Sequence, residues 1–209
     1  MVIYDVEQGT PEWYAVKAGI PSASEFDKII TAGGQPSKQQ HAYQSRLLAE
    51  KMLGRCIEGF AKTPWMDRGN ELEAEAADFY SMSKSLELKK VGFITNDRKT
   101  LGCSPDRIVG EDGLVELKCP AHHTHVDYLE DPLALKKDYH VQVQGQLLVT
   151  ARKWADLVSY CPEMPPVIVR VEADTAFQIA LKRMIDEFNI VLERRRLALV
   201  RLGHIKGEE

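Results

Sequence analysis

The sequence predicts an α/β fold in which a mixed β-sheet is flanked by helices and a long helix ends the chain. Three observations support this class: helical spacing of apolar residues in the N-terminal half, short apolar runs in the middle, and an extended amphipathic pattern near the end. No repeat or Ser/Gly/Pro-rich tract divides the chain, so residues 1–209 are expected to form a single domain of ordinary size.

The N-terminal half is predicted to be helical. Ser22 or Ser24 is suited to cap a short helix, because a serine hydroxyl accepts hydrogen bonds from the first free backbone amides. Two longer helices are expected over residues 37–53 and 66–80, where apolar residues recur at helical spacing. The apolar positions of these three helices are Phe26, Ile29 and Ile30; Leu47, Leu48 and Met52; and Leu72, Ala76 and Phe79.

The middle of the chain is predicted to form strands. Short apolar runs alternate there with Asn-Asp, Asp-Gly and Gly turn signals. The expected strands are 86–91, 93–95, 101–104, 114–118, 154–160 and 167–171, with a helix over 138–150. The long final helix is expected to start with Thr175 and Gln178 as a capping box. Its predicted apolar stripe comprises Phe177, Leu181, Met184, Phe188 and Val191.

Composition excludes several classes of protein. No apolar run approaches the ~20 residues of a membrane helix, and the N-terminus lacks the features of a signal peptide, so a cytoplasmic location is expected. Four scattered cysteines predict free thiols and argue against a zinc or iron–sulfur site. The net charge of −4 is unfavourable for an open nucleic-acid binder, although basic residues predominate over residues 182–206.

Residues 103–118 hold the candidate active site. Asp106 follows a predicted strand at a bend set by Pro105. Glu116 and Lys118 lie two apart on the next predicted strand, so they project from the same face. If the two strands pair, two carboxylates and a lysine meet. Carboxylates suit Mg²⁺ or Mn²⁺, and burial and a nearby metal lower the pKa of a lysine, which can then activate water. The alternative is a surface hairpin with ordinary charges.

Asp106 with Glu116-Leu117-Lys118 resembles the PD…(D/E)xK nuclease motif, and most of the chain resembles the phage lambda exonuclease family, also described as YqaJ-like viral recombinases. The matching residues are Gln8-Gly9, Trp13, Ser22-Ala23-Ser24-Glu25, Gly69 with Glu73, Cys103-Ser104-Pro105-Asp106, Glu116-Leu117-Lys118-Cys119-Pro120 and Gln142-Val143-Gln144. The resemblance implies a restriction-endonuclease-like mixed central β-sheet flanked by helices.

The resemblance also implies an activity. Family members are Mg²⁺-dependent 5′→3′ exonucleases that degrade one strand of linear double-stranded DNA, release mononucleotides and leave 3′ overhangs for recombination. By the match, Asp106, Glu116 and the carbonyl of Leu117 would hold Mg²⁺, for which Mn²⁺ can substitute, and Lys118 would orient or deprotonate water. The implied partners are DNA ends, two further copies in a homotrimeric ring, and a single-strand annealing protein, in a phage or prophage setting. A ring would reconcile the net charge with DNA binding, since it needs fewer phosphate contacts.

Further site positions follow from the same resemblance. Glu73 and Gln142, both on predicted helices, match active-site residues of the family. Gln144 is interpreted as a surface or packing residue, and Tyr139 as a weaker candidate on a similar helix face to Gln142. Asp97 matches a further acid at a spacing one residue shorter, or is simply part of an Asn-Asp turn.

Lys17, Ser24 and Ser104 match a pocket for the 5′-phosphate. Lys17 departs from the arginine of the best-known family member, and lysine offers a charge without the two-pronged guanidinium fork. Ser24 can alternatively be only a helix cap, and Ser104 only a turn residue.

His122, His123 and His125 are expected in a loop near the DNA backbone and not in a zinc site, since histidines so close in sequence rarely all face one ion. The tryptophans are interpreted as core anchors and not as base-stacking platforms. They are Trp13, Trp65 and Trp154. Met66 matches an apolar wedge of the family, but methionine at a helix start is more typical of a core.

Two other functions fit the same motif. An endonuclease of the PD-(D/E)xK superfamily would cut circular DNA, whereas a non-catalytic protein would bind DNA ends without cutting them. The presence of Asp106, Glu116 and Lys118 together favours an enzyme.

Overall fold

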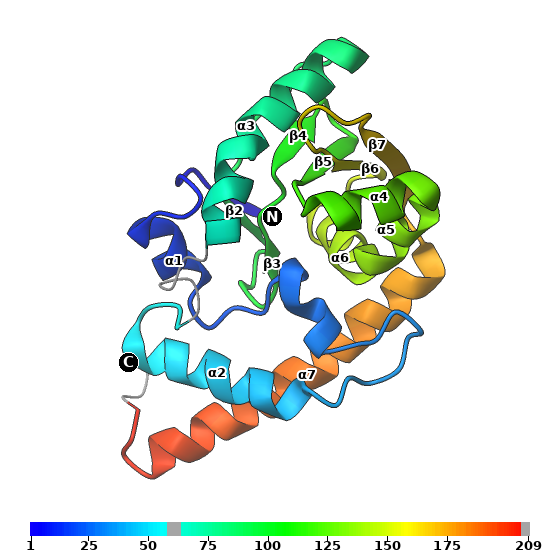
Figure 1. Ribbon diagram of the computed structural model, residues 1–209. Coiled ribbons are helices and arrows are strands. Elements are labelled where there is room, and N and C mark those ends of the chain that lie inside the picture. Colours follow the sequence, from blue (N-terminus) through cyan, green and yellow to red (C-terminus); the bar gives the residue numbers. More distant parts are fainter. Residues whose placement is uncertain (58–63, 206–209) are drawn as a thin grey trace.

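The strands form two sheets. The computed structural model describes residues 1–57 and 64–205, with the side chains of residues 64–71 outside the description (Figure 1). A four-stranded sheet has the order β4 (Arg107–Val109), β5 (Gly113–Lys118), β6 (Trp154–Ser159), β7 (Val167–Glu172). Because β5 and β6 are parallel and the outer pairs antiparallel, this sheet is mixed, as predicted. A three-stranded antiparallel sheet holds β1 (Val2–Tyr4), β2 (Phe93–Thr95) and β3 (Gly102–Cys103).

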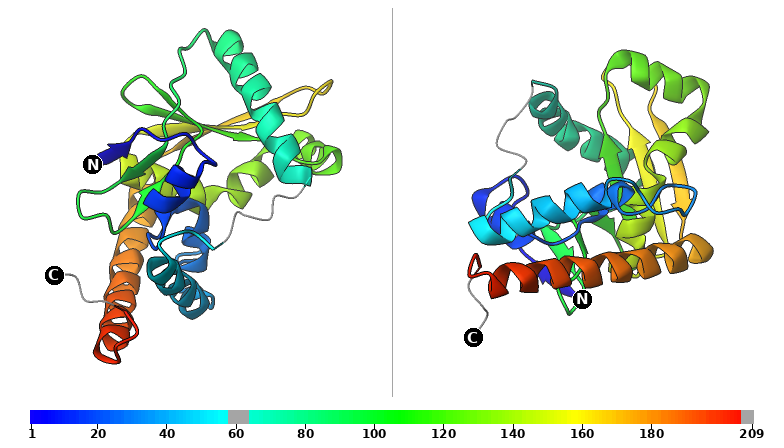
Figure 2. Two further views of the ribbon diagram at one scale, coloured as in Figure 1. Left: turned by 90° about the vertical axis from the view of Figure 1, so that its left-hand side faces the viewer. Right: turned by 90° about the horizontal axis from the view of Figure 1, so that it is seen from below.

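Helices surround both sheets (Figure 1, Figure 2). In chain order they are α1 (Pro11–Lys17), the 3-10 helix η1 (Ala23–Lys28), α2 (Gln40–Leu53), α3 (Pro64–Lys84), α4 (His122–Glu130), α5 (Pro132–Asp138), α6 (His140–Thr150) and α7 (Thr175–Arg201). No helix in the described part of the chain is long and apolar enough to cross a membrane.

The two faces of the four-stranded sheet are covered by different helices. Val115 and Leu117 of β5 pack on one face against Tyr80 of α3. Leu114 of β5 packs on the opposite face against residues of α4, α5 and α6, including Leu147. Side chains alternate along a strand, so Glu116 and Lys118 project from the same face as Leu114. The fold therefore directs both candidate residues toward α6.

A second core lies between η1, α2, α6 and α7, and α2 and α7 run side by side (Figure 2). Helix α6 approaches η1 so closely that a Cβ at Gly145 would lie 2.5 Å from the ring of Phe26. Only glycine fits this contact. The contact matters for the site because α6 carries the glutamines described below.

The C-terminal helix is confirmed, with corrections to its start and its buried face. Asp174 caps it by accepting a hydrogen bond from the amide of Phe177 at 2.9 Å, so the predicted capping box of Thr175 and Gln178 is wrong. Val191 is exposed and Leu192 is buried instead, because the helical period of 3.6 residues shifts the buried stripe along the helix.

Other boundaries also differ from the prediction. Ser22 precedes η1 without a side-chain capping bond, and Met52 of α2 is 51% exposed. Residues 86–91 form only an isolated bridge between Lys89 and Ile108 in place of the predicted strand. Five further elements, α1, α4, α5, β1 and β4, are absent from the sequence prediction, because they are short and have few periodic positions.

Candidate active site

Strand β5 and helix α6 build a polar cluster around Glu116, a carboxylate that is only 3% exposed. Its Oε1 accepts hydrogen bonds from Lys118 Nζ at 2.8 Å and from Gln142 Nε2 at 2.5 Å. Its Oε2 accepts from Gln146 Nε2 at 2.6 Å. Burying a carboxylate is costly unless it is paired and hydrogen-bonded, and these donors satisfy that condition. The half-buried hairpin with ordinary surface charges is therefore excluded.

Asp106 lies in the same cluster, but the strand pairing beside it differs from the one considered in the sequence analysis. The strand before it, β3, belongs to the three-stranded sheet, and β4, which follows it, pairs with β5. The condition that the strand before Asp106 pairs with the strand of Glu116 is not met, because the chain changes sheets at Pro105 and Asp106. The carboxylate instead accepts a hydrogen bond from the backbone amide of Leu117 at 2.6 Å. That bond fixes Asp106 beside the end of β5.

Burial and the neighbouring carboxylates together set the electrostatics of the cluster. Burial raises the pKa of Asp106 well above its usual range, and the neighbouring carboxylates of Glu116 and Glu73 raise it further. Burial would lower the pKa of Lys118, but Glu116 and Asp106 outweigh this and raise it. The lowered lysine pKa was expected beside a bound metal ion, so it stays a prediction for the metal-bound protein.

The residues present fit a hard divalent cation. Within a strand, the amide and carbonyl of one residue point to the same side, so the carbonyl of Leu117 points toward Asp106 as its amide does. Strand β4 begins at Arg107, opposite Val115, so its pairing with β5 does not extend to this carbonyl. Two carboxylates with excess negative charge and a backbone carbonyl are the oxygen ligands that Mg²⁺ or Mn²⁺ prefers. Among residues with described side chains, no group of three or more His, Cys, Asp or Glu could hold a metal.

The other predicted site residues fall into two groups. Glu73 lies next to the cluster and accepts a hydrogen bond from buried Arg107 at 2.7 Å. The ring centroid of Tyr139 lies 4.3 Å from Lys118 Nζ. Gln144 instead donates to the carbonyl of Glu172 at 2.8 Å and accepts from the amide of Asp174 at 2.9 Å, so it joins α6 to the start of α7. The structure therefore brings Glu73 and Tyr139 to the cluster and gives Gln144 a packing role.

Asp97 is not brought to this cluster. Its side chain is 84% exposed, and it pairs with the N-terminal ammonium of Met1. The turn that contains it is stabilised by Asn96, whose side chain accepts a hydrogen bond from the amide of Thr100. The turn interpretation, and not the additional acid, agrees with this position.

The Lys17 cavity lies next to the cleft that contains Asp106. The cleft, of about 700 Å³, is lined by Asp106 and Glu73, and the cavity, of about 260 Å³, is lined by Lys17 and Ser24. Trp13 lines both spaces. Its indole donates to Ser104 Oγ at 2.9 Å, and Lys17 Nζ lies 3.7 Å from its ring centroid. All three predicted phosphate-binding residues thus gather around Trp13, which is a wall of the site and not a buried core anchor.

The histidine-rich segment is not a loop. Residues 122–130 form α4, and His125 is fully buried with ring nitrogens 2.7 Å from Ser159 Oγ and 2.9 Å from the carbonyl of Pro165. This histidine holds α4 on the sheet. Trp154 packs partly buried against the α3 side of the sheet, as expected of an anchor. The side chains of Trp65 and Met66 lie outside the described residues.

Two residues of these sites were not predicted from the sequence. Gln146 is four residues after Gln142 on α6, so helical spacing brings both amides to the same carboxylate. This i, i+4 relation was a signal that could have found it. Arg46 of α2 lines the Lys17 cavity, and no local pattern in the sequence connects it to α1.

The chain is similar to one protein-family model and to several solved structures. Residues 12–153 match the model of the YqaJ-like viral recombinase domain. An alkaline exonuclease, LHK-Exo, from Laribacter hongkongensis is 30% identical, with a TM-score of 0.82 over 93% of this chain and 98% of that chain. The structure of LHK-Exo in complex with dAMP is 29% identical, with a TM-score of 0.83 over the same shares.

A phage-related exonuclease from Haemophilus somnus 129PT shares the fold at 16% identity, with a TM-score of 0.70 over 86% of this chain and 96% of that chain. No curated protein sequence matches the chain.

Proposed function

The chain belongs to the YqaJ-like viral recombinase family, and we propose that it is a metal-dependent DNA exonuclease acting on linear double-stranded DNA in the 5′→3′ direction. The observation that carries this proposal is the convergence of Asp106, Glu116 and Lys118 at the end of β5. The similarity of the chain to an alkaline exonuclease supports DNA as the substrate. One structure of that exonuclease contains dAMP, which supports a nucleotide as the product.

The chain's own residues would divide the reaction between them. Asp106, Glu116 and the Leu117 carbonyl would hold Mg²⁺ or Mn²⁺, which when bound polarises the scissile phosphate and lowers the pKa of coordinated water. Lys118 would orient the attacking water and stabilise the negative charge that develops on the phosphate. Gln142 and Gln146 hold Glu116 in a fixed orientation through their amides. Lys118 would orient the attacking water or, as a neutral amine, accept its proton.

The Lys17 cavity supports the direction of digestion. A cavity next to the catalytic cleft, lined by a lysine and a serine, suits a terminal phosphate and would place the 5′ nucleotide in the cleft. The remaining parts of the proposal are a homotrimeric ring, which would retain DNA despite the net charge of −4, and an annealing protein that receives the 3′ overhang.

The test is digestion of a linear duplex labelled separately at its 5′ and 3′ ends, with Mg²⁺, with Mn²⁺ and with chelator. A covalently closed circle serves as the second substrate. We expect metal-dependent release of the 5′ label as mononucleotide and no cutting of the circle. Cutting of the circle would replace the proposal with an endonuclease. Binding of DNA ends without cutting in either metal would leave a non-catalytic end-binding protein.

The proposed ring is tested separately by measuring the mass of the protein in solution. A trimer with and without DNA supports it, and a monomer at micromolar concentration that still digests DNA contradicts it.

A further inference from the structure

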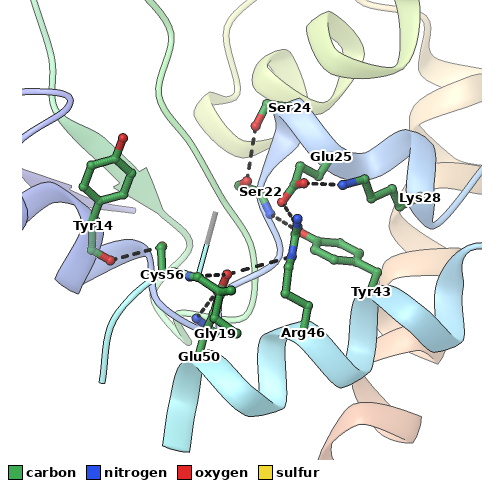
Figure 3. Close-up of polar contacts among 11 residues, drawn as sticks. Tyr14, Gly19, Ser22, Ser24, Glu25, Lys28, Tyr43, Arg46, Glu50 and Cys56 are labelled. Carbon is green, nitrogen blue, oxygen red and sulfur yellow. Dashed lines mark hydrogen bonds and ion pairs between the residues drawn. The ribbon is translucent and has the colours of Figure 1, made fainter. Parts of the chain in front are cut away.

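Arg46 and Arg107 are two mostly buried arginines that pair with carboxylates close to the candidate active site. Arg46 forms ion pairs with Glu25 and, at 3.8 Å, with Glu50, and all three residues belong to the wall of the smaller cavity (Figure 3). Arg107 directly follows Asp106 in the chain and lines the cleft together with it. Of these two arginines, Arg107 is therefore the one that lies beside the proposed metal ligands.

One nitrogen of Arg107 joins α3 to the chain segment that carries Asp106. Its Nη1 donates to Glu73 Oε1 at 2.7 Å and to the carbonyl oxygen of Asp106 at 2.6 Å, and the side chain is only 6% exposed. Arg107 lies opposite Val115 in the pairing of β4 with β5, so both side chains project toward α3, against which Val115 packs. The sheet therefore directs the guanidinium to the helix that carries Glu73.

The ion pair between Arg107 and Glu73 suits a carboxylate that is held in place for a ligand. A buried ion pair is weak evidence for stability, because taking both groups out of water is costly. Glu73 is 31% exposed and lines the cleft, and no donor among the described residues contacts its Oε2. A carboxylate only accepts hydrogen bonds, so its ligand in the cleft must be a donor, and water is the donor that hydrolysis requires.

Glu73 also adds negative charge next to the proposed metal ligands. Its carboxylate is close enough to Asp106 to contribute to the raised pKa of that group. A guanidinium keeps its proton in proteins, so Arg107 offsets the charge of Glu73 whenever Glu73 is ionised. Without Arg107, a third carboxylate would add its full charge to those of Asp106 and Glu116 and would be free to turn toward the metal ion.

We propose that Arg107 is a positioning residue of the reaction, which fixes the Glu73 carboxylate at the wall of the cleft and neutralises its charge. Glu73 then accepts a hydrogen bond from water in the cleft, while the metal ion is held by Asp106 and Glu116. This inference rests on the proposed exonuclease function and adds to it a residue that acts through Glu73.

The first test measures the dissociation constant for Mn²⁺ without DNA, by electron paramagnetic resonance of the free ion. Arg107→Met removes the offsetting charge, so we expect it to bind Mn²⁺ about tenfold more tightly. Glu73→Gln should bind Mn²⁺ more weakly than the native protein, and the double variant, which lacks both charges, should resemble the native protein. Arg107→Lys should also resemble it, because a single nitrogen makes both hydrogen bonds and an ammonium can donate twice. Weaker Mn²⁺ binding by folded Arg107→Met would overturn the inference, since disordered ligands and not charge would then explain the effect.

The second test measures kcat and KM on a 5′-labelled linear duplex at saturating Mg²⁺. Arg107→Met should lower kcat about tenfold with KM for DNA nearly unchanged, because a displaced Glu73 affects the chemical step. In the Glu73→Gln background the same substitution should lower kcat by about twofold or less, because the carboxylate that Arg107 positions is already lost. An equal rise of KM in both backgrounds would show that Arg107 binds DNA directly, and would overturn the inference.

Arg152→Met is the matched control. Nη1 of Arg152 donates to three backbone carbonyls of the same β4–β5 hairpin, those of Val109, Gly110 and Gly113, and among its described contacts there is no carboxylate of the site. Its loss should reduce stability without changing kcat or the Mn²⁺ dissociation constant. Melting temperatures and far-UV circular dichroism show whether each variant is folded. Arg107→Gln keeps a donor but lacks the charge, so it should also bind Mn²⁺ more tightly and replaces Arg107→Met if that variant does not fold.

The outcomes separate this inference from the function on which it rests. A native protein that digests no duplex with either metal contradicts the exonuclease proposal. A native protein that digests DNA, with kcat and Mn²⁺ binding unchanged in folded Arg107→Met, overturns the role of Arg107 and leaves the exonuclease intact. Equal losses of kcat in Arg107→Met and Arg152→Met would also overturn it, since a disturbed hairpin would then explain both.

Discussion

The two polar clusters of this molecule, one at Glu116 and one around the Lys17 cavity, are built from different kinds of structure. The cluster at Glu116 stands on one strand and one helix, whose regular backbones set its geometry, and its central carboxylate is 3% exposed. The Lys17 cavity is assembled from α1, η1 and α2, and its ions hold one another, as in the pair between Arg46 and Glu25. We therefore expect a substitution in the first cluster to lower the rate of digestion, and one in the second to change mainly stability.

The largest effect is expected from a substitution in the cluster at Glu116. Lys118→Ala removes the only cation that contacts Glu116 among the described side chains, and we expect the single-turnover rate of end-label release to fall about a thousandfold. Lys153→Ala is the matched control, because Lys153 is an exposed lysine that pairs with Asp112, and its loss should leave the rate unchanged. A Lys118→Ala variant as active as the native protein would favour a different catalytic centre.

The next largest effect is expected on α6, where Gln146 positions Glu116 and Gln144 has a packing role. Gln146→Leu leaves Oε2 of buried Glu116 without its donor, which should lower the unfolding free energy by about 1–3 kcal/mol and reduce kcat about tenfold. Gln144→Leu also loses buried hydrogen bonds, at the start of α7, and should reduce stability with little change in kcat. Chemical denaturation and saturating kinetics measure both quantities. Equal kcat losses in the two variants would show that Gln146 acts only through stability.

A smaller effect is expected from a substitution in the ion pairs around the Lys17 cavity. Burial would raise the pKa of Glu25, but hydrogen bonds from Arg46 and Lys28 outweigh it and lower the pKa below the usual 4.5. A depressed carboxylate pKa contributes stability above the unfolded-state pKa, and that contribution is lost as the pH falls through the folded-state pKa. Glu25→Gln should therefore be less stable than the native protein by about 1 kcal/mol at neutral pH. Urea unfolding at several pH values should show the gap closing in acid, and a gap that is constant with pH would contradict this.

The smallest effect tests a residue that lies outside both clusters. Asp97→Asn should leave kcat and the metal dependence of digestion unchanged, because the side chain is 84% exposed and pairs with the N-terminus. A metal titration of activity measures this. A reduced metal affinity in the variant would return Asp97 to the catalytic residues.

Local sequence determined much of the first cluster. The alternation of β5 is sufficient to place Glu116 and Lys118 on one face, and the helical period of α6 places Gln142 and Gln146 on one face, because side-chain direction depends only on neighbouring backbone geometry. The mixed sheet and the long C-terminal helix followed from hydrophobic periodicity in the same way. Tertiary structure decided which strand lies beside Asp106: the change of sheet at Pro105 leaves no periodic signature, so pairing with β4 replaced the pairing that chain order suggested.

The Lys17 cavity shows the same division more sharply. Family resemblance identified Lys17, Ser24 and Ser104, yet nothing in the sequence connected them to Arg46, which is 29 residues beyond Lys17 on another helix. The contact depends on how α2 packs against α7 and η1, and such packing is fixed by the sum of many apolar contacts that no single residue pattern encodes. The sequence by itself therefore determined which side chains share a face of β5 and of α6, and only the tertiary structure decided which charges meet around the cavity beside them.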